Sequence, residues 1–335
     1  MTYVPVPPVP YDPDLEPGLA AFLDLVERIP LRAGTIHVNR AHFETIVPPA
    51  DTQIGDRPVD VEHRRVPGPD GAPEIELTIL RPRDGGAPAA GRPAIYQIHG
   101  GGMILGNRFF GLDGLADLVL RTGAVGVSVE YRLAPEHPGP AAAEDCYAGL
   151  CWLAGNAAAL GVDPQRILVG GASAGGGLSA AVALMARDRG GPDLVGQLLD
   201  CPMLDDRNET VSARQYDGIG AWDRNNNDTA WDAILGADRF TDAVSPYSAP
   251  ARATDLSGLP PAFVTVGAAE VFRDEAIAYA GRIWASGGTA ELHVWSGGYH
   301  GFSGFSAGTA VAAASDDARL SWIDRVLGTA TQGSV

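Results

Sequence analysis

The feature that most constrains the fold is a regular alternation of short apolar segments with longer alanine-rich segments, beginning near residue 92. The short apolar segments lie at 94–98, 124–129, 166–170, 197–199, 262–266 and 290–295. The segments of helical length between and after them lie at 111–122, 141–159, 175–189, 274–286 and 309–326. Strands that are apolar along their whole length and are separated by helices are typical of a mainly parallel sheet covered on both faces. The pattern therefore predicts an α/β fold.

The remaining segments predict how this sheet is extended and covered. Segments 59–66 and 74–80 are separated by a Pro-Gly-Pro-Asp-Gly loop, which predicts an antiparallel pair of strands. Residues 1–50 carry a helical apolar stripe, whereas residues 205–258 interrupt the alternation and are expected to form a helical lid. The predicted organisation is N-terminal cap helices at 1–50, a core at 51–204 and 259–335, and a cap insertion at 205–258.

Composition excludes several classes of function. The chain has 24 basic residues, all of them arginine, against 41 acidic ones, a net charge of −17 that does not suit a nucleic-acid-binding protein. The absence of lysine excludes lysine Schiff-base chemistry and a P-loop. Without a long apolar run or a signal-like start, and with only Cys146, Cys151 and Cys201, we expect a cytoplasmic protein with reduced cysteines and no membrane partner.

The motif Gly171-Ala-Ser-Ala-Gly175 predicts a nucleophilic serine. It follows the expected strand 166–170 and precedes a helix, and this strand–turn–helix context exposes a serine hydroxyl above a sheet. A second match to the same pattern, Gly304-Phe-Ser-Ala-Gly308, has no strand before it. We therefore predict that Ser173, and not Ser306, is the nucleophile.

Two further motifs supply the other groups that acyl transfer needs. His99-Gly-Gly-Gly102 ends an expected strand, and its backbone N–H groups, with that of Ala174, could bind an oxyanion. His300 follows the last expected strand and is the histidine best placed to act as a general base.

The acid that orients the histidine should follow strand 262–266, because the chain order of these groups is serine, acid, histidine. Three carboxylates lie there, and Glu270 is favoured because it is closest to the end of the strand. Asp274 is the next candidate. Asp274 and Glu275 also suit the solvated start of a helix.

Four motifs together resemble the hormone-sensitive-lipase family of carboxylesterases (bacterial family IV), which has the α/β-hydrolase fold with a helical cap. They are His99-Gly-Gly-Gly-Met103, Tyr131-Arg-Leu-Ala-Pro-Glu-His-Pro138, Gly171-Ala-Ser-Ala-Gly-Gly176 and Gly297-Gly-Tyr-His-Gly-Phe302. The resemblance implies that Gly101 and Gly102 donate to the oxyanion. It also implies that Glu136 and Asp145 tie core loops near the site. Two positions depart from the family, since Ala172 precedes the serine and the acid is a glutamate.

The predicted function is a serine carboxylesterase that hydrolyses small esters with short to medium acyl chains through an acyl-enzyme, without metal or cofactor. An apolar pocket could be lined by Met103, Phe109, Phe110, Trp222 and Trp231. An amidase, deacetylase or lactonase would use the same groups, and a non-catalytic binding protein on this fold is a remote alternative. The family resemblance also suggests a homodimer formed through strand 290–295 and the helix beside it.

Overall fold

The structure is a computed structural model that describes residues 6–26, 29–83, 88 and 90–329. Residues 1–5 and 27–28 of the predicted N-terminal cap segment lie outside these described residues. So do residues 84–87, 89 and 330–335 of the predicted core. One eight-stranded sheet has the order β1-β2-β4-β3-β5-β6-β7-β8. The strands are β1 (Val59–Val66), β2 (Ile75–Pro82), β3 (Arg92–Ile98), β4 (Val125–Val129), β5 (Val162–Ala172), β6 (Gly196–Asp200), β7 (Ala262–Gly267) and β8 (Ala290–Trp295).

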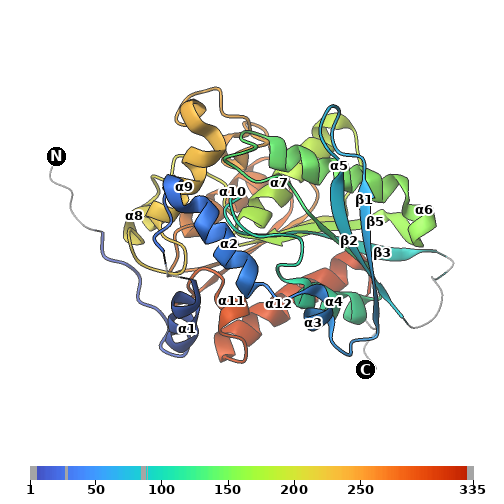
Figure 1. Ribbon diagram of the computed structural model, residues 1–335, viewed down its shortest axis with the longest axis horizontal. Helices are drawn as coiled ribbons and strands as arrows, with labels where there is room; N and C mark the ends of the chain where they lie inside the picture. Colours follow the sequence, from blue (N-terminus) through green and yellow to red (C-terminus); the bar gives the residue numbers. More distant parts are fainter. Residues whose placement is uncertain (1–5, 27–28, 84–87, 89, 330–335) are drawn as a thin grey trace.

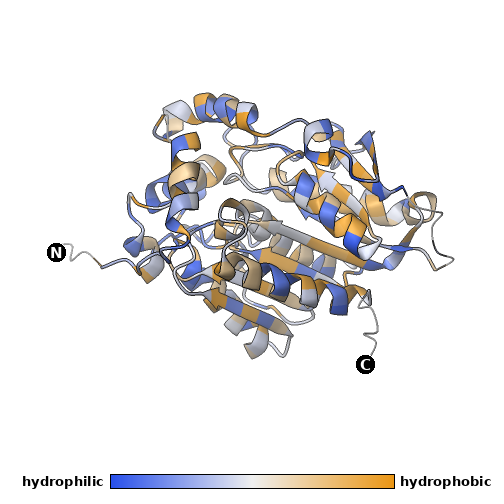
Figure 2. Ribbon diagram, turned by 90° about the horizontal axis from the view of Figure 1, so that it is seen from below, coloured by the Kyte–Doolittle hydropathy of each residue, from blue (hydrophilic) through white to orange (hydrophobic). Residues whose placement is uncertain are grey.

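The pairing confirms the predicted α/β class. Strands β3 to β8 pair in parallel with their neighbours, whereas β1–β2 and β2–β4 are antiparallel. Side chains alternate between the two faces along β3, where Tyr96 joins one core cluster and Ile95 joins another. The central strands β3, β4, β6 and β7 are therefore buried on both faces, which explains why they are largely apolar in sequence (Figure 2), whereas the edge strand β1 is charged and partly exposed.

Helices cover both faces of the sheet (Figure 1). Helices α4 (Leu112–Thr122) and α12 (Ala310–Leu327) pack into the cluster on one face. Helices α5 (Ala141–Gly155), α7 (Ala174–Arg189) and α10 (Arg273–Ala285) cover the other. Because β3 to β8 are parallel, the loops at the carboxyl ends of these strands come together at one edge of the sheet.

The remaining helices and turns pack around this layered core. They are α1 (Glu16–Val26), α2 (Ile36–Ile46), α3 (Ala50–Ile54), α6 (Ala157–Leu160), α8 (Val211–Gln215), α9 (Arg224–Leu235), α11 (Phe302–Phe305) and the 3₁₀ turns η1 (Ala33–Thr35), η2 (Gly236–Asp238) and η3 (Pro250–Arg252). Figure 1 shows α1, α2, α8 and α9 toward the end of the molecule where the N-terminus lies, away from β1 and α6. Two hydrogen bonds join the segment before α1 to the insertion, from Gln215 Nε2 to the Pro7 carbonyl (2.7 Å) and from the Tyr216 hydroxyl to the Val9 carbonyl (2.8 Å).

Two element boundaries differ from the predictions. The single helix expected over 141–159 is wrong, because the chain breaks at Asn156, whose side-chain amide donates to the Trp152 carbonyl (2.8 Å) and competes with the helical ladder. Strand β5 begins at Val162, four residues before the expected start at 166, because Arg92 of β3 pairs with Val162 across a register shift. In the part of the chain that the structure describes, no helix combines the length and apolar character needed to cross a bilayer.

Candidate active site

The candidate nucleophile lies at the turn between β5 and α7. Ser173 has φ 59° and ψ −122°, a backbone conformation that non-glycine residues rarely adopt. The turn is tight because a Cβ on Gly171 would lie 2.3 Å from the Ile98 carbonyl oxygen, and one on Gly175 would lie 2.0 Å from the same atom. Only glycine fits at both positions, so the motif flanks the serine with the two residues that its strained backbone requires.

The structure brings Ser173, His300 and Glu270 together in one hydrogen-bonded row. His300 Nε2 lies 3.0 Å from Ser173 Oγ, and His300 Nδ1 lies 2.7 Å from Glu270 Oε2. A carboxylate oxygen can only accept, so Nδ1 carries the proton and Nε2 is left to accept from the serine hydroxyl. This tautomer is the one that a general base for Ser173 requires.

Glu270 is buried, with 2% of its surface exposed, and is held from its other oxygen. Its Oε1 accepts a hydrogen bond from the Gly267 N–H (3.1 Å). The loop that carries Glu270 is joined to the loop that carries His300 by backbone bonds from Ala268 to Trp295 (2.7 Å) and from Ala269 to Gly298 (2.9 Å). These bonds fasten the two loops to each other. The glutamate side chain, which is longer than that of an aspartate, reaches the imidazole from this position.

The other two candidate acids serve a different purpose. Asp274 Oδ2 accepts from the Ser212 N–H (2.7 Å), and Glu275 Oε1 accepts from the Leu204 N–H (2.6 Å). Burial raises the pKa of Glu275 well above its usual value. Both carboxyl groups thus fasten the beginning of the 205–258 insertion to α10.

The glycine loop, residues 99–106, lies beside Ser173. Gly101 and Gly102 have φ of 108° and 63°, and a Cβ on Gly101 would lie 2.3 Å from the Leu105 carbonyl oxygen. Among the described residues, neither of these glycine N–H groups has a backbone hydrogen-bond acceptor. Ala174 is the first residue of α7, where backbone N–H groups have no partner within the helix. These three N–H groups can therefore bind an anion.

The buried His99 side chain contacts both the glycine loop and Tyr131. Its Nδ1 donates to the Gly100 carbonyl (2.8 Å), and its ring stacks on Tyr131 at 4.1 Å with an angle of 13° between planes. Burial lowers the pKa of His99 to about 4, so the ring stays neutral near pH 7. The Tyr131 hydroxyl donates to the His99 carbonyl (2.9 Å), which ties the motif 131–138 to the same loop.

The predicted pocket residues fall into two groups. Trp222 lies against the glycine loop, with Cη2 2.8 Å from the position of a Cβ on Gly102, and Phe110 lies 3.7 Å from that of Gly100. Met103 is buried within the glycine loop itself. In contrast, Trp231 is fully buried in the main core, and Phe109 packs on the opposite face of the sheet, where its ring meets that of His63 at 5.6 Å. Trp231 is therefore a core residue, whereas Phe109 is half-buried and packs against the core.

Other predicted residues have structural contacts. Ser306 is buried and shares a 2.8 Å hydrogen bond with the Tyr299 hydroxyl. Its hydroxyl therefore makes a structural contact and is not exposed to a substrate. Asp145 is fully buried and holds Arg132 through two oxygens, at 2.8 Å each. Glu136 pairs with Arg40 of α2 (3.0 Å). Asp145 thus holds the start of the 131–138 motif to α5, as the resemblance implied.

Two neighbours of His300 carried no signal in the sequence. The ring of Phe272 meets the imidazole edge-on at 5.1 Å and limits its rotation. The Cys201 sulfur, Glu270 and His300 offer ligand atoms within 4.8 Å of one another, yet burial raises the pKa of this thiol well above its usual value. A protonated thiol is a poor metal ligand, and the other two groups already bind each other. All three cysteines are free, with Cys146 and Cys201 buried.

Comparison with known proteins agrees with this geometry. A family model described as alpha/beta hydrolase fold, Abhydrolase_3, matches residues 95–304. Carboxylesterase NlhH of Mycobacterium tuberculosis is 37% identical over 325 residues, which cover 94% of this chain and 97% of the relative. Carboxylic ester hydrolase LipN of the same species is 38% identical over 250 residues, covering 73% of this chain and 64% of the relative.

Solved structures are similar over almost the whole chain. A bacterial heroin esterase has a TM-score of 0.86 at 35% identity, and the match covers 95% of this chain and 98% of that one. An esterase of Pyrobaculum calidifontis has a TM-score of 0.81 at 32% identity, covering 96% and 100%. The chain is a carboxylic ester hydrolase, and it belongs to the hormone-sensitive-lipase-like (bacterial family IV) carboxylesterases of the α/β-hydrolase fold.

Proposed function

We propose that Ser173, His300 and Glu270 form the catalytic triad and that the enzyme hydrolyses esters through an acyl-enzyme on Ser173. The observation that supports this most strongly is the hydrogen-bonded row from Ser173 Oγ through His300 to Glu270, at 3.0 and 2.7 Å. The strained backbone at Ser173 adds to it, because such strain is stored where a side chain must be held in one reactive orientation.

In the first half of the proposed reaction, Ser173 Oγ attacks the ester carbonyl carbon while His300 Nε2 takes the hydroxyl proton. The carbonyl electron pair moves onto oxygen, and Glu270 stabilises the imidazolium that forms. The tetrahedral intermediate then collapses, the bond to the alcohol oxygen breaks, and the alcohol leaves with the proton from His300. Water repeats the sequence on the acyl-enzyme, releases the acid and restores the Ser173 hydroxyl.

Gly101, Gly102 and Ala174 are the proposed donors to the oxyanion. Such a donor contributes roughly 3 kcal/mol to transition-state stabilisation when it is already oriented. The absence of a backbone acceptor for Gly101 and Gly102 among the described residues supports this role, since the donors stay available without prior rearrangement.

The proposed substrates are small esters with short to medium acyl chains. Trp222 and Phe110 lie against the glycine loop and Met103 is buried within it, which supports an apolar surround for the acyl chain. One relative, 32% identical over 211 residues, is named Arylesterase, which supports aryl esters as test substrates.

The test is hydrolysis of para-nitrophenyl esters from acetate to dodecanoate by the wild type, Ser173→Ala and Ser306→Ala. The proposal expects activity that is highest on short to medium chains and is lost only in Ser173→Ala. Labelling by a fluorophosphonate should disappear in the same variant. Full activity of Ser173→Ala would contradict the proposed nucleophile, and higher turnover of the matching anilides or lactones would contradict the proposed ester preference.

We also propose that residues 1–50 and 205–258 form a cap over the site. The hydrogen bonds from Gln215 and Tyr216 to the segment before α1 support the view that the two segments form one unit. Trp222 against Gly102 supports its position over the glycine loop. Replacing Trp222 with alanine should widen the chain-length preference on the same ester series.

A homodimer through β8 is the proposed oligomeric state. Strand β8 is at the edge of the sheet, and Val294 on it and Trp284 on α10 are 41% and 48% exposed. An edge strand of this kind can pair with a second copy. Light scattering after size-exclusion chromatography should give twice the chain mass, and a proline in place of Val294 should give the monomer.

A further inference from the structure

The back of the glycine loop is held by a second loop, residues 131–137, which we call the support loop. The Tyr131 hydroxyl donates to the His99 carbonyl (2.9 Å), and the Ala134 N–H donates to the Met103 carbonyl (2.9 Å). The glycine loop itself closes through the N–H groups of Ile104 and Leu105, which donate to the Gly101 carbonyl at 3.1 and 2.8 Å. The direction of the Gly101 and Gly102 N–H groups therefore depends on how Ile104 and the support loop are placed.

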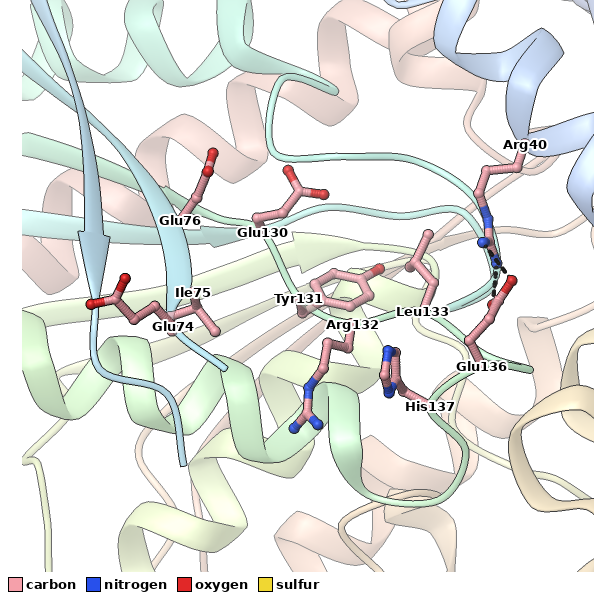
Figure 3. Close-up of a pocket in the computed structure, with 10 residues that line it drawn as sticks. All are labelled: Arg40, Glu74, Ile75, Glu76, Glu130, Tyr131, Arg132, Leu133, Glu136 and His137. Carbon is pink, nitrogen blue, oxygen red and sulfur yellow. Dashed lines mark hydrogen bonds and ion pairs between the residues drawn. The ribbon is translucent and has the colours of Figure 1, made fainter. Parts of the chain in front are cut away.

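One side chain from outside the sheet core bridges these two loops. Arg40, on α2, donates from Nε to the Ile104 carbonyl (3.0 Å) and from Nη2 to the Ala134 carbonyl (2.9 Å). Its two terminal nitrogens also bind the two carboxylate oxygens of Glu136, at 3.0 Å each. Figure 3 shows this pair at the rim of a cavity of about 430 Å³, with Tyr131 and Leu133 of the support loop beside it.

A second contact from the same helix reaches the other end of the glycine loop. Phe43 lies one helical turn after Arg40, and its ring meets that of Phe110 edge-on at 5.0 Å. Phe110 in turn lies 3.7 Å from the position of a Cβ on Gly100. Helix α2 thus supports the glycine loop at Ile104 through Arg40 and at Gly100 through Phe43.

We propose that Arg40 is a positioning residue for ester hydrolysis, which holds the glycine loop and the support loop in the register that directs the Gly101 and Gly102 N–H groups at the oxyanion. This inference depends on the proposed role of those two N–H groups. The flat, forked guanidinium suits the task because its donors reach two carbonyls and both oxygens of a carboxylate at once, whereas a lysine has three donors on a single nitrogen.

The expected effect of Arg40 on the rate of the reaction differs in size from its expected effect on folding stability. Glu136 is 53% exposed, so solvent screens its ion pair with Arg40 and the pair contributes little to folding. Misplacing reacting groups by ~1 Å can cost on the order of 100-fold in rate. Loss of Arg40 should therefore reduce turnover far more than it reduces stability.

The test compares Arg40→Gln, Arg40→Lys and Glu136→Gln with wild type on para-nitrophenyl acetate. Arg40→Gln should lower kcat by roughly 10-fold or more, with KM changed by less than about threefold. Arg40→Lys, which keeps the charge and one carbonyl contact, should recover part of the loss. Glu136→Gln, which leaves the contacts of Arg40 to both carbonyls, should lose less than Arg40→Gln.

A trifluoromethyl ketone inhibitor gives a second measurement, the inhibition constant, which does not depend on the fraction of enzyme that is folded. Ser173 Oγ adds to its carbonyl carbon, the proton passes to His300, and the resulting oxyanion occupies the proposed hole. Across the variants, the inhibition constant should rise in proportion to the fall in kcat/KM. Inhibition that stays as tight as in wild type while kcat/KM falls would overturn the proposal.

Arg57→Gln is the matched control. Arg57 also binds a carboxylate with two nitrogens, at 2.6 and 3.2 Å from Asp117, and the carbonyls of Gln53 (2.8 Å) and Ile54 (3.4 Å), but none of these contacts is to the glycine loop. It should keep the wild-type kcat. If Arg40→Gln also keeps the wild-type kcat while Ser173→Ala is inactive, the positioning role fails and the triad stands. If Ser173→Ala remains active, the proposed function itself fails.

Discussion

At the scale of single residues, the geometry of His300 depends on groups from two other loops, the one after β7 and the turn between β5 and α7. Glu270 accepts its Nδ1 proton, Phe272 limits its rotation, and Ser173 donates to its Nε2. Glu270 is itself fixed by the Gly267 N–H, so the charge and the position of the carboxylate can be separated by substitution.

Replacing Glu270 with glutamine tests its charge. The amide is isosteric but cannot stabilise an imidazolium, so kcat should fall by on the order of 10³-fold with little change in KM. Steady-state kinetics on para-nitrophenyl acetate measure this. Asp274→Asn is the control, because this carboxylate faces Ser212, and its kcat should stay within about threefold of wild type. Equal losses in the two variants would contradict the choice of Glu270.

His99 makes a pH-dependent contribution to stability. Burial lowers its pKa from 6.5 to about 4, so between these values the unfolded chain binds a proton that the folded protein does not. Stability from this group is therefore full above pH 6.5 and is lost as the pH falls to about 4, by roughly 3 kcal/mol in total.

The measurement is the free energy of unfolding in urea across that pH interval for wild type and His99→Gln. A comparison between variants is needed, because burial raises the pKa of Asp200 to about 6, which gives the opposite trend over part of the interval. Wild type should lose stability more steeply than the variant as the pH falls. Parallel curves would mean that the pKa of His99 is the same in the folded and the unfolded protein, so that it becomes protonated in both.

At the scale of elements, the turn between β5 and α7 depends on close backbone approach. The two Gly-x-Ser-x-Gly matches provide a direct comparison, because a Cβ on Gly171 would lie 2.3 Å from a carbonyl oxygen, whereas one on Gly304 would meet nothing within 4 Å. The same sequence pattern therefore has a strict steric requirement in one place and none in the other.

Gly171→Ala should destabilise the fold by about 3 kcal/mol or more, or prevent folding, since the backbone itself would have to move. Gly304→Ala, in α11, should leave stability within about 1 kcal/mol of wild type. Thermal unfolding followed by circular dichroism measures both. Equal melting temperatures for the two variants would show that the turn tolerates a Cβ.

These comparisons indicate which parts of the molecule can be predicted from sequence. The eight strands, the elbow at Ser173 and the position of His300 follow from local patterns, because apolar runs and glycine motifs act over a few residues. The support of the site by Arg40 and the burial of Trp231 could not be predicted, since both depend on contacts with segments far away in sequence. The break at Asn156 was missed because one side-chain hydrogen bond decides it.

At the scale of the whole molecule, the dominant property is the net charge of −17 on a chain without lysine. Arginine side chains are engaged in ion pairs at many points on the surface, for example Arg57 with Asp117 and Arg189 with Glu144. Pairing removes the local effect of these cations, so the excess of acidic groups sets the long-range field around the site.

This field should discriminate between esters by charge. We expect the mono-para-nitrophenyl ester of glutaric acid, an anion, to have a kcat/KM that rises roughly threefold or more between about 10 mM and about 500 mM ionic strength. The neutral para-nitrophenyl butyrate should change by less than about 1.5-fold over the same range, because its approach involves no net charge. Initial rates below KM with the same enzyme preparation give both values. Salt screens long-range repulsion but has little effect on the short hydrogen bonds of the proposed triad. A kcat/KM for the anion that stays flat or falls with salt would therefore show that local cations, and not the net charge, govern access to Ser173.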